Sequence, residues 1–258
     1  MAKTLPDITL SKDELMYLKD NLNQYHSGCE GIIIKGEDPR VVRKIFLYDI
    51  DKAYTKPREK VEQMRQNKLK KIQILGNMHQ LKNDLKVTRT ISHEGIFMGY
   101  EMVSSFPQFP LDTNPLYVEN LIPYLKRLRD ILEDYHKHGI VFGDVKANNV
   151  LQNQEFDIVS FCDVDNIQVG NLPIDLPNFC IQRFEQEDGL IPEAVDHYMF
   201  NLLTLSELFY GSKFYRDVEE KIKRGDFPTG LTKESYKILT KMAECKNTCP
   251  TGYIIDNL

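Results

Sequence analysis

Two stretches near the middle of the chain decide the fold: His138-Gly-Ile-Val-Phe-Gly-Asp-Val-Lys-Ala-Asn-Asn-Val-Leu151 and Phe161-Cys-Asp-Val-Asp-Asn166. Branched apolar residues at the ends of the first stretch predict short strands on either side of a polar loop. That loop carries Asp144, Lys146 and Asn149. Such polar side chains either cap the turns of a helix-loop-strand or form a site for chemistry.

These residues resemble the catalytic loop and metal-binding turn of protein kinases. In the family pattern H-R-D-L-K-x-x-N, Asp144, Lys146 and Asn149 match, and the Asp of D-F-G falls on Asp163, nineteen residues after Asp144. The resemblance implies that Asp144 orients the attacking hydroxyl and accepts its proton, while Lys146 offsets charge on the transferring phosphoryl group. It also implies that Asn149 and Asp163 bind Mg²⁺ through hard oxygen ligands.

The amino-terminal half resembles the nucleotide-binding part of the same family. Gly28-Cys-Glu-Gly31-Ile-Ile33 is similar to the second half of the glycine-rich loop, whose backbone approaches the phosphates. Val41-Val-Arg-Lys44 resembles V-A-I-K, which implies that Lys44 holds the α- and β-phosphates of ATP. Gly28, Gly31, Ile33 and Lys44 are therefore expected at the cofactor; the alternative for Lys44 is a solvent-facing strand lysine.

In protein kinases a glutamate of the following helix pairs with that lysine. Glu62 is the residue we expect in this role, and Glu59, one turn earlier, is the alternative. Both glutamates also suit a solvated helix face, because the stretch from Lys52 to Lys71 holds eight basic and two acidic residues.

Two more segments extend the resemblance. Tyr100-Glu-Met-Val103 resembles the hinge, which implies that backbone groups of Glu101 and Val103 bind adenine beside Tyr100; an ordinary strand end is the alternative. Asp196 begins a segment similar to the kinase helix whose aspartate holds the catalytic-loop backbone.

The sequence departs from the family pattern in both central stretches, and D-F-G reads Asp163-Val164-Asp165. Phe142 and Gly143 replace the His and Arg of H-R-D, and Asp165 replaces the glycine of D-F-G. Asp165 either adds a metal contact or caps the turn. Between Asp163 and Asp196 there is no Ser, Thr or Tyr, so we expect an activity that needs no phosphorylation of this segment.

The fold class that follows is α+β, a bilobal protein kinase-like fold. Residues 1–103 are expected to form a small β-rich lobe, with a capped helix after Ser11, hairpins over 31–46 and 86–103, and a basic helix from Thr55 or Pro57 to about Leu81. Residues 104–258 are expected to form a mainly helical lobe that starts with a proline-containing linker and has a shortened end.

Charge and composition limit the kinds of partner and the compartment that we expect for the chain. A formal charge of −5 argues against a chain built mainly to neutralise nucleic acid, and no apolar run approaches the roughly 20 residues that span a bilayer. The opening segment lacks the order of a secretory signal, and five cysteines are an odd number, so we expect a cytoplasmic chain with reduced thiols. Cys245 and Cys249 would form half a zinc site, but the sequence offers no second pair nearby.

The leading hypothesis is an enzyme that uses ATP and Mg²⁺ to phosphorylate Ser or Thr of a protein substrate, since Lys146 is typical of that class. A small-molecule phosphotransferase of the aminoglycoside or choline type is an alternative, because Gly143-Asp144 is similar to its H-G-D loop. The short spacing from Glu101 to Asp144 favours the protein kinases over it. A pseudokinase that binds nucleotide as a scaffold is the third hypothesis.

Overall fold

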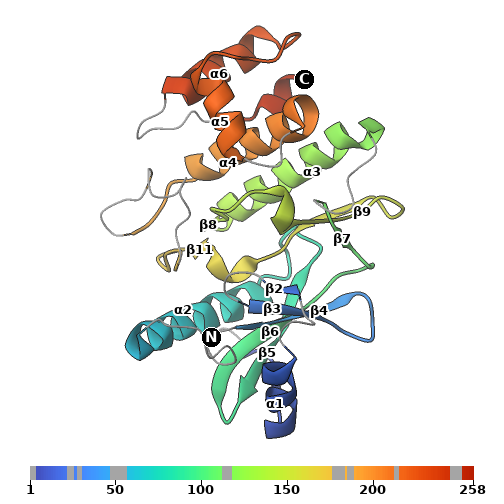
Figure 1. Cartoon of the computed structure of the whole chain (residues 1–258), viewed down its shortest axis with the longest axis vertical. Helices are drawn as coiled ribbons and strands as arrows, with labels where there is room; N and C mark the ends of the chain where they lie inside the picture. Colours follow the sequence, from blue (N-terminus) through green and yellow to red (C-terminus); the bar gives the residue numbers. More distant parts are fainter. Residues whose placement is uncertain are drawn as a thin grey trace. The chain divides into compact units, whose positions relative to one another are not determined.

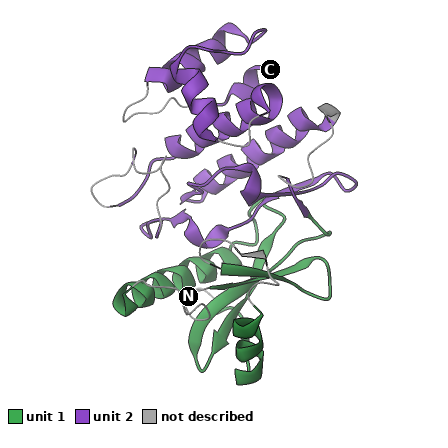
Figure 2. Cartoon of the chain, viewed as in Figure 1, with its two compact units in different colours: residues 1–108 green, residues 109–258 purple. Residues whose placement is uncertain are grey.

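The computed structural model describes residues 4–21, 26–27, 31–46, 57–111, 118–175, 184, 189–211, 215–244 and 252–258. The chain forms two compact units, residues 1–108 and 109–258 (Figure 2). The boundary lies five residues after the expected one because the linker is tied to the first unit. The amide of Ser104 donates to the carbonyl of Arg40 (3.1 Å), and Ser105 and Gln108 both bond to the carboxylate of Asp84.

A mixed six-stranded sheet forms the centre of the first unit (Figure 1). Its strands are β1 (Asp7–Thr9), β2 (His26–Ser27), β3 (Gly31–Lys35), β4 (Val41–Phe46), β5 (Lys86–His93) and β6 (Ile96–Val103), in the order β1-β5-β6-β4-β3-β2. Both expected hairpins are confirmed as antiparallel pairs, β3 with β4 and β5 with β6. Only the β1–β5 pair is parallel among these neighbours, and β1 was not predicted.

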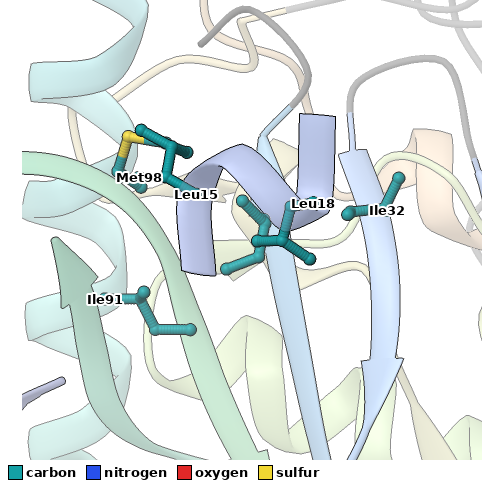
Figure 3. Packing of buried hydrophobic residues seen from close by; sticks show 6 residues of the cluster. Leu15, Leu18, Ile32, Ile91 and Met98 are labelled. Carbon is teal, nitrogen blue, oxygen red and sulfur yellow. The ribbon is translucent and has the colours of Figure 1, made fainter. Parts of the chain in front are cut away.

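Helix α1 (Lys12–Asp20) covers one face of this sheet. Its capping box is confirmed, because the Ser11 side chain accepts from the amide of Glu14 while the Glu14 carboxylate accepts from the amide of Ser11. Leu15 and Leu18 are buried against Ile32, Ile45, Ile91 and Met98 (Figure 3). Each such leucine contributes roughly 1.5–3 kcal/mol by leaving water.

Helix α2 (Arg58–Asn77) packs against β5 and β6. It begins after Pro57 and ends four residues before Leu81, because Met78 leaves the helical conformation; Thr55 lies outside the described residues. A buried stripe at helical spacing faces the sheet: Val61, Met64, Lys68, Lys71, Ile72 and Leu75. The interpretation of the basic stretch as a solvated helix face is therefore wrong for Lys68 and Lys71, which are buried.

The second unit is mainly helical, so the chain as a whole is α+β with a β-rich amino-terminal part. Helix α3 (Val118–Lys137) is followed by the hairpin of β9 (Val150–Asn153) and β10 (Ile158–Phe161), which β7 (Phe109–Pro110) extends. A second small pair joins β8 (Ile140–Val141) to β11 (Gln168–Val169). The remaining helices are α4 (Ala194–Leu205), α5 (Tyr215–Lys223) and α6 (Lys233–Glu244), with a π turn (Ser206–Tyr210) after α4 and a 3-10 turn (Ile254–Asn257) near the end.

Helix α4 is the central element of this unit. Apolar side chains on all its sides are buried, which is typical of a helix surrounded by other elements. Asn201 fixes the carboxyl end of the chain to it, because Oδ1 accepts from the amide of Ile254 (2.8 Å) and Nδ2 donates to the carbonyl of Gly252 (3.1 Å). Among the described residues, no helix combines the length and the apolar character needed to cross a membrane.

Candidate active site

Asp196 at the start of α4 organises the loop that carries the predicted catalytic residues. Its side chain is fully buried, and its two carboxylate oxygens accept from the backbone amides of Phe142 (2.8 Å) and Gly143 (2.6 Å). The prediction that Asp196 binds the backbone of this loop is thus confirmed. Hydrogen bonds to an ionised acceptor in a buried site are stronger than neutral ones, so this contact fixes the loop where it leaves β8.

His136 in the last turn of α3 makes a third bond to the same carboxylate. Its Nε2 lies 2.8 Å from Oδ2 of Asp196. Burial lowers the pKa of His136, but the hydrogen bond and charge of Asp196, together with Glu193 and Glu133, outweigh burial and raise it above its ordinary value. The neighbouring His197 ring lies 5.5 Å away, and burial followed by repulsion from His136 lowers its pKa. His136 therefore takes up a proton before His197 does.

Phe142 and Gly143 hold the loop in a way that His and Arg would not. The Phe142 ring is buried, with its centroid 4.6 Å from that of Phe161 and 6.4 Å from that of Tyr135. Gly143 has φ +73°, a left-handed conformation that costs a side-chain-bearing residue roughly 1–2 kcal/mol. The loop is thus anchored by packing and by a glycine that adopts this turn without strain.

The three predicted loop residues converge on one carboxylate. Nζ of Lys146 lies 2.7 Å from Oδ2 of Asp144, and Nδ2 of Asn149 donates to the same oxygen at 2.9 Å. Asn149 also donates to the backbone carbonyl of Asp144 (2.9 Å), which closes the loop into a compact turn. The Asp144 side chain is 19% exposed and that of Lys146 is 41% exposed, so a solvent-borne group can reach both.

Asp163 lies beside this turn. The amide of Cys162 donates to the carbonyl of Asn149 (2.9 Å), which joins the end of β10 to the loop. Asp163 follows with φ +64° and ψ +45°, a left-handed residue that starts the 3-10 turn Val164–Asn166. Asp165 within that turn is fully buried, whereas Asp163 is partly exposed. Asp163 is therefore the better placed of the two carboxylates for an incoming ligand.

The oxygen atoms at this position suit Mg²⁺. Because Nδ2 of Asn149 donates to Asp144, the amide oxygen of Asn149 points away from that carboxylate. An amide oxygen and the Asp163 carboxylate are hard ligands, and Mg²⁺ ordinarily takes its remaining ligands from phosphates and water. Within the described ranges, no group of three or more His, Cys, Asp or Glu side chains could hold a metal ion.

In the first unit, Lys44 lies at the centre of β4. Its neighbours across the sheet are Ile33 on β3 and Tyr100 on β6, and it is only 6% exposed, which excludes the solvent-facing alternative. Gly31 makes room for it, because a β-carbon at Gly31 would lie 3.1 Å from Cε of Lys44 and 2.8 Å from the carbonyl oxygen of Ile45. Gly31, Ile33 and Lys44 are thus brought together, while Gly28 lies outside the described residues.

The assignment of Glu62 as the partner of Lys44 is wrong. Its carboxylate accepts from Nη1 of Arg65 (2.5 Å) and Nε2 of Gln66 (3.3 Å), and its side chain is 50% exposed. The alternative, Glu59, is exposed as well. Both glutamates belong to the face of α2 opposite the buried stripe, because the apolar residues of the helix set which side packs on the sheet.

The hinge interpretation of Glu101 and Val103 is corrected too. Both residues belong to β6, where Glu101 is aligned with Arg43 on β4 and Arg89 on β5. The Glu101 side chain is buried and accepts from Nε of Arg43 (3.0 Å). A residue paired on both sides of a sheet has no backbone group to offer to adenine.

One residue of the site, His136, and one buried lysine of α2, Lys68, were not predicted. His136 was overlooked because its role depends on α4, which is distant in the sequence. Lys68 was overlooked because the basic character of α2 hid its position at helical spacing between Met64 and Ile72. The apolar period of the helix was the signal that could have found it.

Comparison of the sequence with models of known protein families found no match, and a search of curated proteins found none either.

Proposed function

We propose that the chain is an ATP- and Mg²⁺-dependent phosphotransferase of the protein kinase type, with Ser or Thr of a protein as acceptor. The observation that carries this proposal is the Asp144 carboxylate, bonded to Lys146 and Asn149 on a loop that the buried Asp196 holds from behind. The confirmed α+β arrangement supports the bilobal kinase fold as part of the same proposal. The odd number of cysteines supports a cytoplasmic location.

Each loop residue would have one role. Asp144 would orient the acceptor hydroxyl and take its proton, since it is the partly exposed carboxylate of the loop. Lys146 would move from Asp144 to the transferring phosphoryl oxygens and offset their charge. Asn149 and Asp163 would hold Mg²⁺, which when bound supplies neutralisation of the phosphate charge.

The first unit would bind the nucleotide. Lys44 is a buried cation, and Gly31 leaves the backbone and the lysine side chain close together. An ammonium group in a low-dielectric site attracts phosphate oxygens more strongly than one in water. Lys44 would therefore hold the α- and β-phosphates, as the resemblance implies.

Incubation of the full chain with labelled ATP, Mg²⁺ and dephosphorylated casein tests the proposal. We expect incorporation that Asp144→Asn reduces by about 100-fold or more, because a positioned general base contributes 10²–10⁴-fold. Asp157→Asn is the matched control, since Asp157 is an exposed carboxylate that pairs with Arg127 and should leave incorporation unchanged. Equal incorporation by the wild type and Asp144→Asn would overturn the proposal.

A pseudokinase scaffold is the second candidate, and the ion pair of Asp144 with Lys146 is the observation that favours it, because Lys146 occupies the carboxylate oxygen that an acceptor hydroxyl would approach. Nucleotide binding without any incorporation into casein would support this candidate. Incorporation into an aminoglycoside or choline instead of casein would identify the small-molecule class.

A further inference from the structure

The start of α4 is joined at more than one point to the strand pair that leads into the candidate catalytic loop. One connection is the bonding of Asp196 to the amides of Phe142 and Gly143, described above. Another runs through Gln168, the first residue of β11. Gln168 is aligned with Val141, the last residue of β8, which directly precedes Phe142 (Figure 1). Both connections therefore act at the end of β8 from which the loop leaves.

The side chain of Gln168 clamps one backbone position with two hydrogen bonds. Its Oε1 accepts from the amide of Ile191 (2.7 Å), and its Nε2 donates to the carbonyl of the same residue (3.1 Å). Gln168 is 7% exposed and Ile191 is 3% exposed. A buried backbone amide and carbonyl need hydrogen-bond partners. In this clamp one neutral side chain satisfies both groups, as a neighbouring strand would.

Ile191 lies five residues before Asp196. Short-range bonds turn the chain between them into α4: the amide of Val195 donates to the carbonyl of Pro192 (3.0 Å), and the amide of Asp196 donates to that of Glu193 (2.9 Å). A segment this short that is bonded at both ends leaves Asp196 little freedom relative to β11. The clamp on Ile191 and the bonds of Asp196 thus close a ring of contacts, which runs from β11 through the start of α4 to the loop and back along β8.

The two kinds of contact in this ring differ in their chemistry. The contact of Asp196 is charged and includes His136, whose raised pKa makes it sensitive to pH. The contact of Gln168 is neutral, so it neither titrates nor responds to salt. No Ser, Thr or Tyr lies between Asp163 and Asp196, so this part of the sequence offers no hydroxyl whose phosphate could order it. A permanent amide clamp supplies order here without a modification.

We propose that Gln168 is a positioning residue for the candidate catalytic loop. By fixing Ile191, it keeps the Asp196 carboxylate aligned with the loop amides, and through the loop it keeps Asp144 in place. This inference rests on the proposed function for its effect on phosphoryl transfer, whereas its effect on the loop can be measured without any activity. It also accounts for the expected independence from phosphorylation.

Asn201 provides a matched control, because it makes the same pair of bonds elsewhere on α4. Its Oδ1 accepts from the amide of Ile254, and its Nδ2 donates to the carbonyl of Gly252. Gln168→Leu and Asn201→Leu each remove one acceptor and one donor that serve the backbone of the same unit. Both variants should lose comparable stability, and only Gln168→Leu should affect the loop.

Hydrogen exchange, followed by mass spectrometry that resolves single amides, measures the clamp and the loop separately. In Gln168→Leu the amide of Ile191 should exchange about tenfold faster or more, because it loses its acceptor. The amides of Phe142 and Gly143 should also exchange faster, by at least about threefold, because Asp196 is no longer held in line with them. Unchanged exchange at Ile191, or at both loop amides, would overturn the inference.

Transfer of labelled phosphate to dephosphorylated casein gives the second readout. Gln168→Leu should lower incorporation by about tenfold or more, because a displacement of about 1 Å at a reacting group can cost about 10²-fold. Asn201→Leu should speed exchange at Ile254 but leave incorporation and loop-amide exchange within about threefold of the wild type. An equal loss of incorporation in both variants would show a general loss of structure and overturn the inference. If the wild type transfers no phosphate, the proposed function fails, whereas faster loop-amide exchange in Gln168→Leu alone leaves the positioning role standing.

Gln168→Glu tests the same bonds through pH and covers the case in which Gln168→Leu does not fold. A protonated carboxyl group offers a donor and an acceptor, as the amide does, whereas a carboxylate offers only acceptors and repels the carbonyl of Ile191. Burial raises the pKa of a carboxyl group introduced at this position. The charged groups closest to the clamp along the chain, Asp165 and Glu193, are acids and raise that pKa further.

The ratio of exchange rates between Gln168→Glu and the wild type is the quantity to follow. At the Ile191 amide this ratio should be near one at pH 5 and should rise to about ten by pH 9, as the introduced carboxyl group ionises. Both proteins are compared at the same pH, so the titration of His136 affects them alike. A ratio that stays constant from pH 5 to pH 9 would contradict the clamp.

Discussion

The substitution Asp196→Asn tests whether one buried carboxylate holds the candidate catalytic loop. Asp196 is fully buried and accepts from three donors: the amides of Phe142 and Gly143 and the ring of His136. Asparagine has the same shape, but it offers one acceptor oxygen and turns an NH₂ group toward the other donors. The change therefore removes charge and acceptor capacity without leaving a cavity.

The expected loss of stability is large. A hydrogen bond to a charged group contributes about 1.5–3 kcal/mol, and removal of one member of a buried charged set typically costs 3–5 kcal/mol. The three bonds share one carboxylate, so their contributions do not add independently. We expect Asp196→Asn to lower the free energy of unfolding by about 3–5 kcal/mol, out of the roughly 5–15 kcal/mol that folded proteins have.

Urea unfolding measures this difference. The chain has 13 Tyr and no Trp, so tyrosine fluorescence and far-ultraviolet circular dichroism are suitable probes. If the two units unfold in separate steps, the transition of residues 109–258 is the one that should shift. Asp157→Asn, which removes an exposed charge beside Arg127, should cost less than about 1 kcal/mol. A loss for Asp196→Asn no larger than for this control would refute the reasoning.

Three further substitutions probe the histidine, the glycine and the buried acid. The pKa of His136 is raised, so the stability that His136 contributes is complete below its ordinary value of 6.5 and is lost as the pH rises through the raised value. In urea titrations, the difference in free energy of unfolding between the wild type and His136→Asn should shrink from pH 6 to pH 9, and a difference that stays constant over this range would contradict the reasoning. Gly143→Ala should lower the free energy of unfolding, measured with urea, by about 1–2 kcal/mol, because φ is +73° at this position. An unchanged free energy of unfolding would show that the turn accepts a side chain without strain. Glu101→Gln should lower the free energy of unfolding by about 1–3 kcal/mol and lower the melting temperature, whereas the exposed Glu94→Gln should not. Equal melting temperatures would refute a stabilising ion pair between the buried Glu101 and the half-exposed Arg43.

Much of the fold could be predicted because local signals agree with tertiary packing. The turn Glu94-Gly95, in which both residues have positive φ, closes the β5–β6 hairpin, and the Ser11 capping box starts α1. Strand β1 could not be predicted, since three residues with one apolar side chain carry no strand pattern. Its place depends on contacts with distant β5, such as the amide of Thr90 donating to the carbonyl of Pro6 (2.9 Å).

The same distinction applies to the candidate site. Asp144, Lys146 and Asn149 lie within six positions, so short-range geometry brings them together, and the resemblance of this loop to the kinase catalytic loop was enough to predict that they group. Which side of α2 faces the sheet depends on tertiary packing, because the apolar stripe of the helix is the side that packs. The resemblance to protein kinases led to Glu62 as the partner of Lys44, whereas the apolar spacing from Met64 to Leu75 places Lys68 inside.

Phe142 and Gly143 differ from the protein kinase pattern that the loop resembles, and both residues help to hold the loop in place. Where the family has a charged arginine before the catalytic aspartate, Gly143 takes a left-handed turn that brings its amide to Asp196. Where the family has histidine, Phe142 is buried against Phe161, at the end of the strand that leads to Asp163. Phe142 and Gly143 therefore hold the loop by packing and by backbone geometry. A loop held in this way has no arginine to receive a phosphate, which agrees with a sequence that offers no hydroxyl between Asp163 and Asp196.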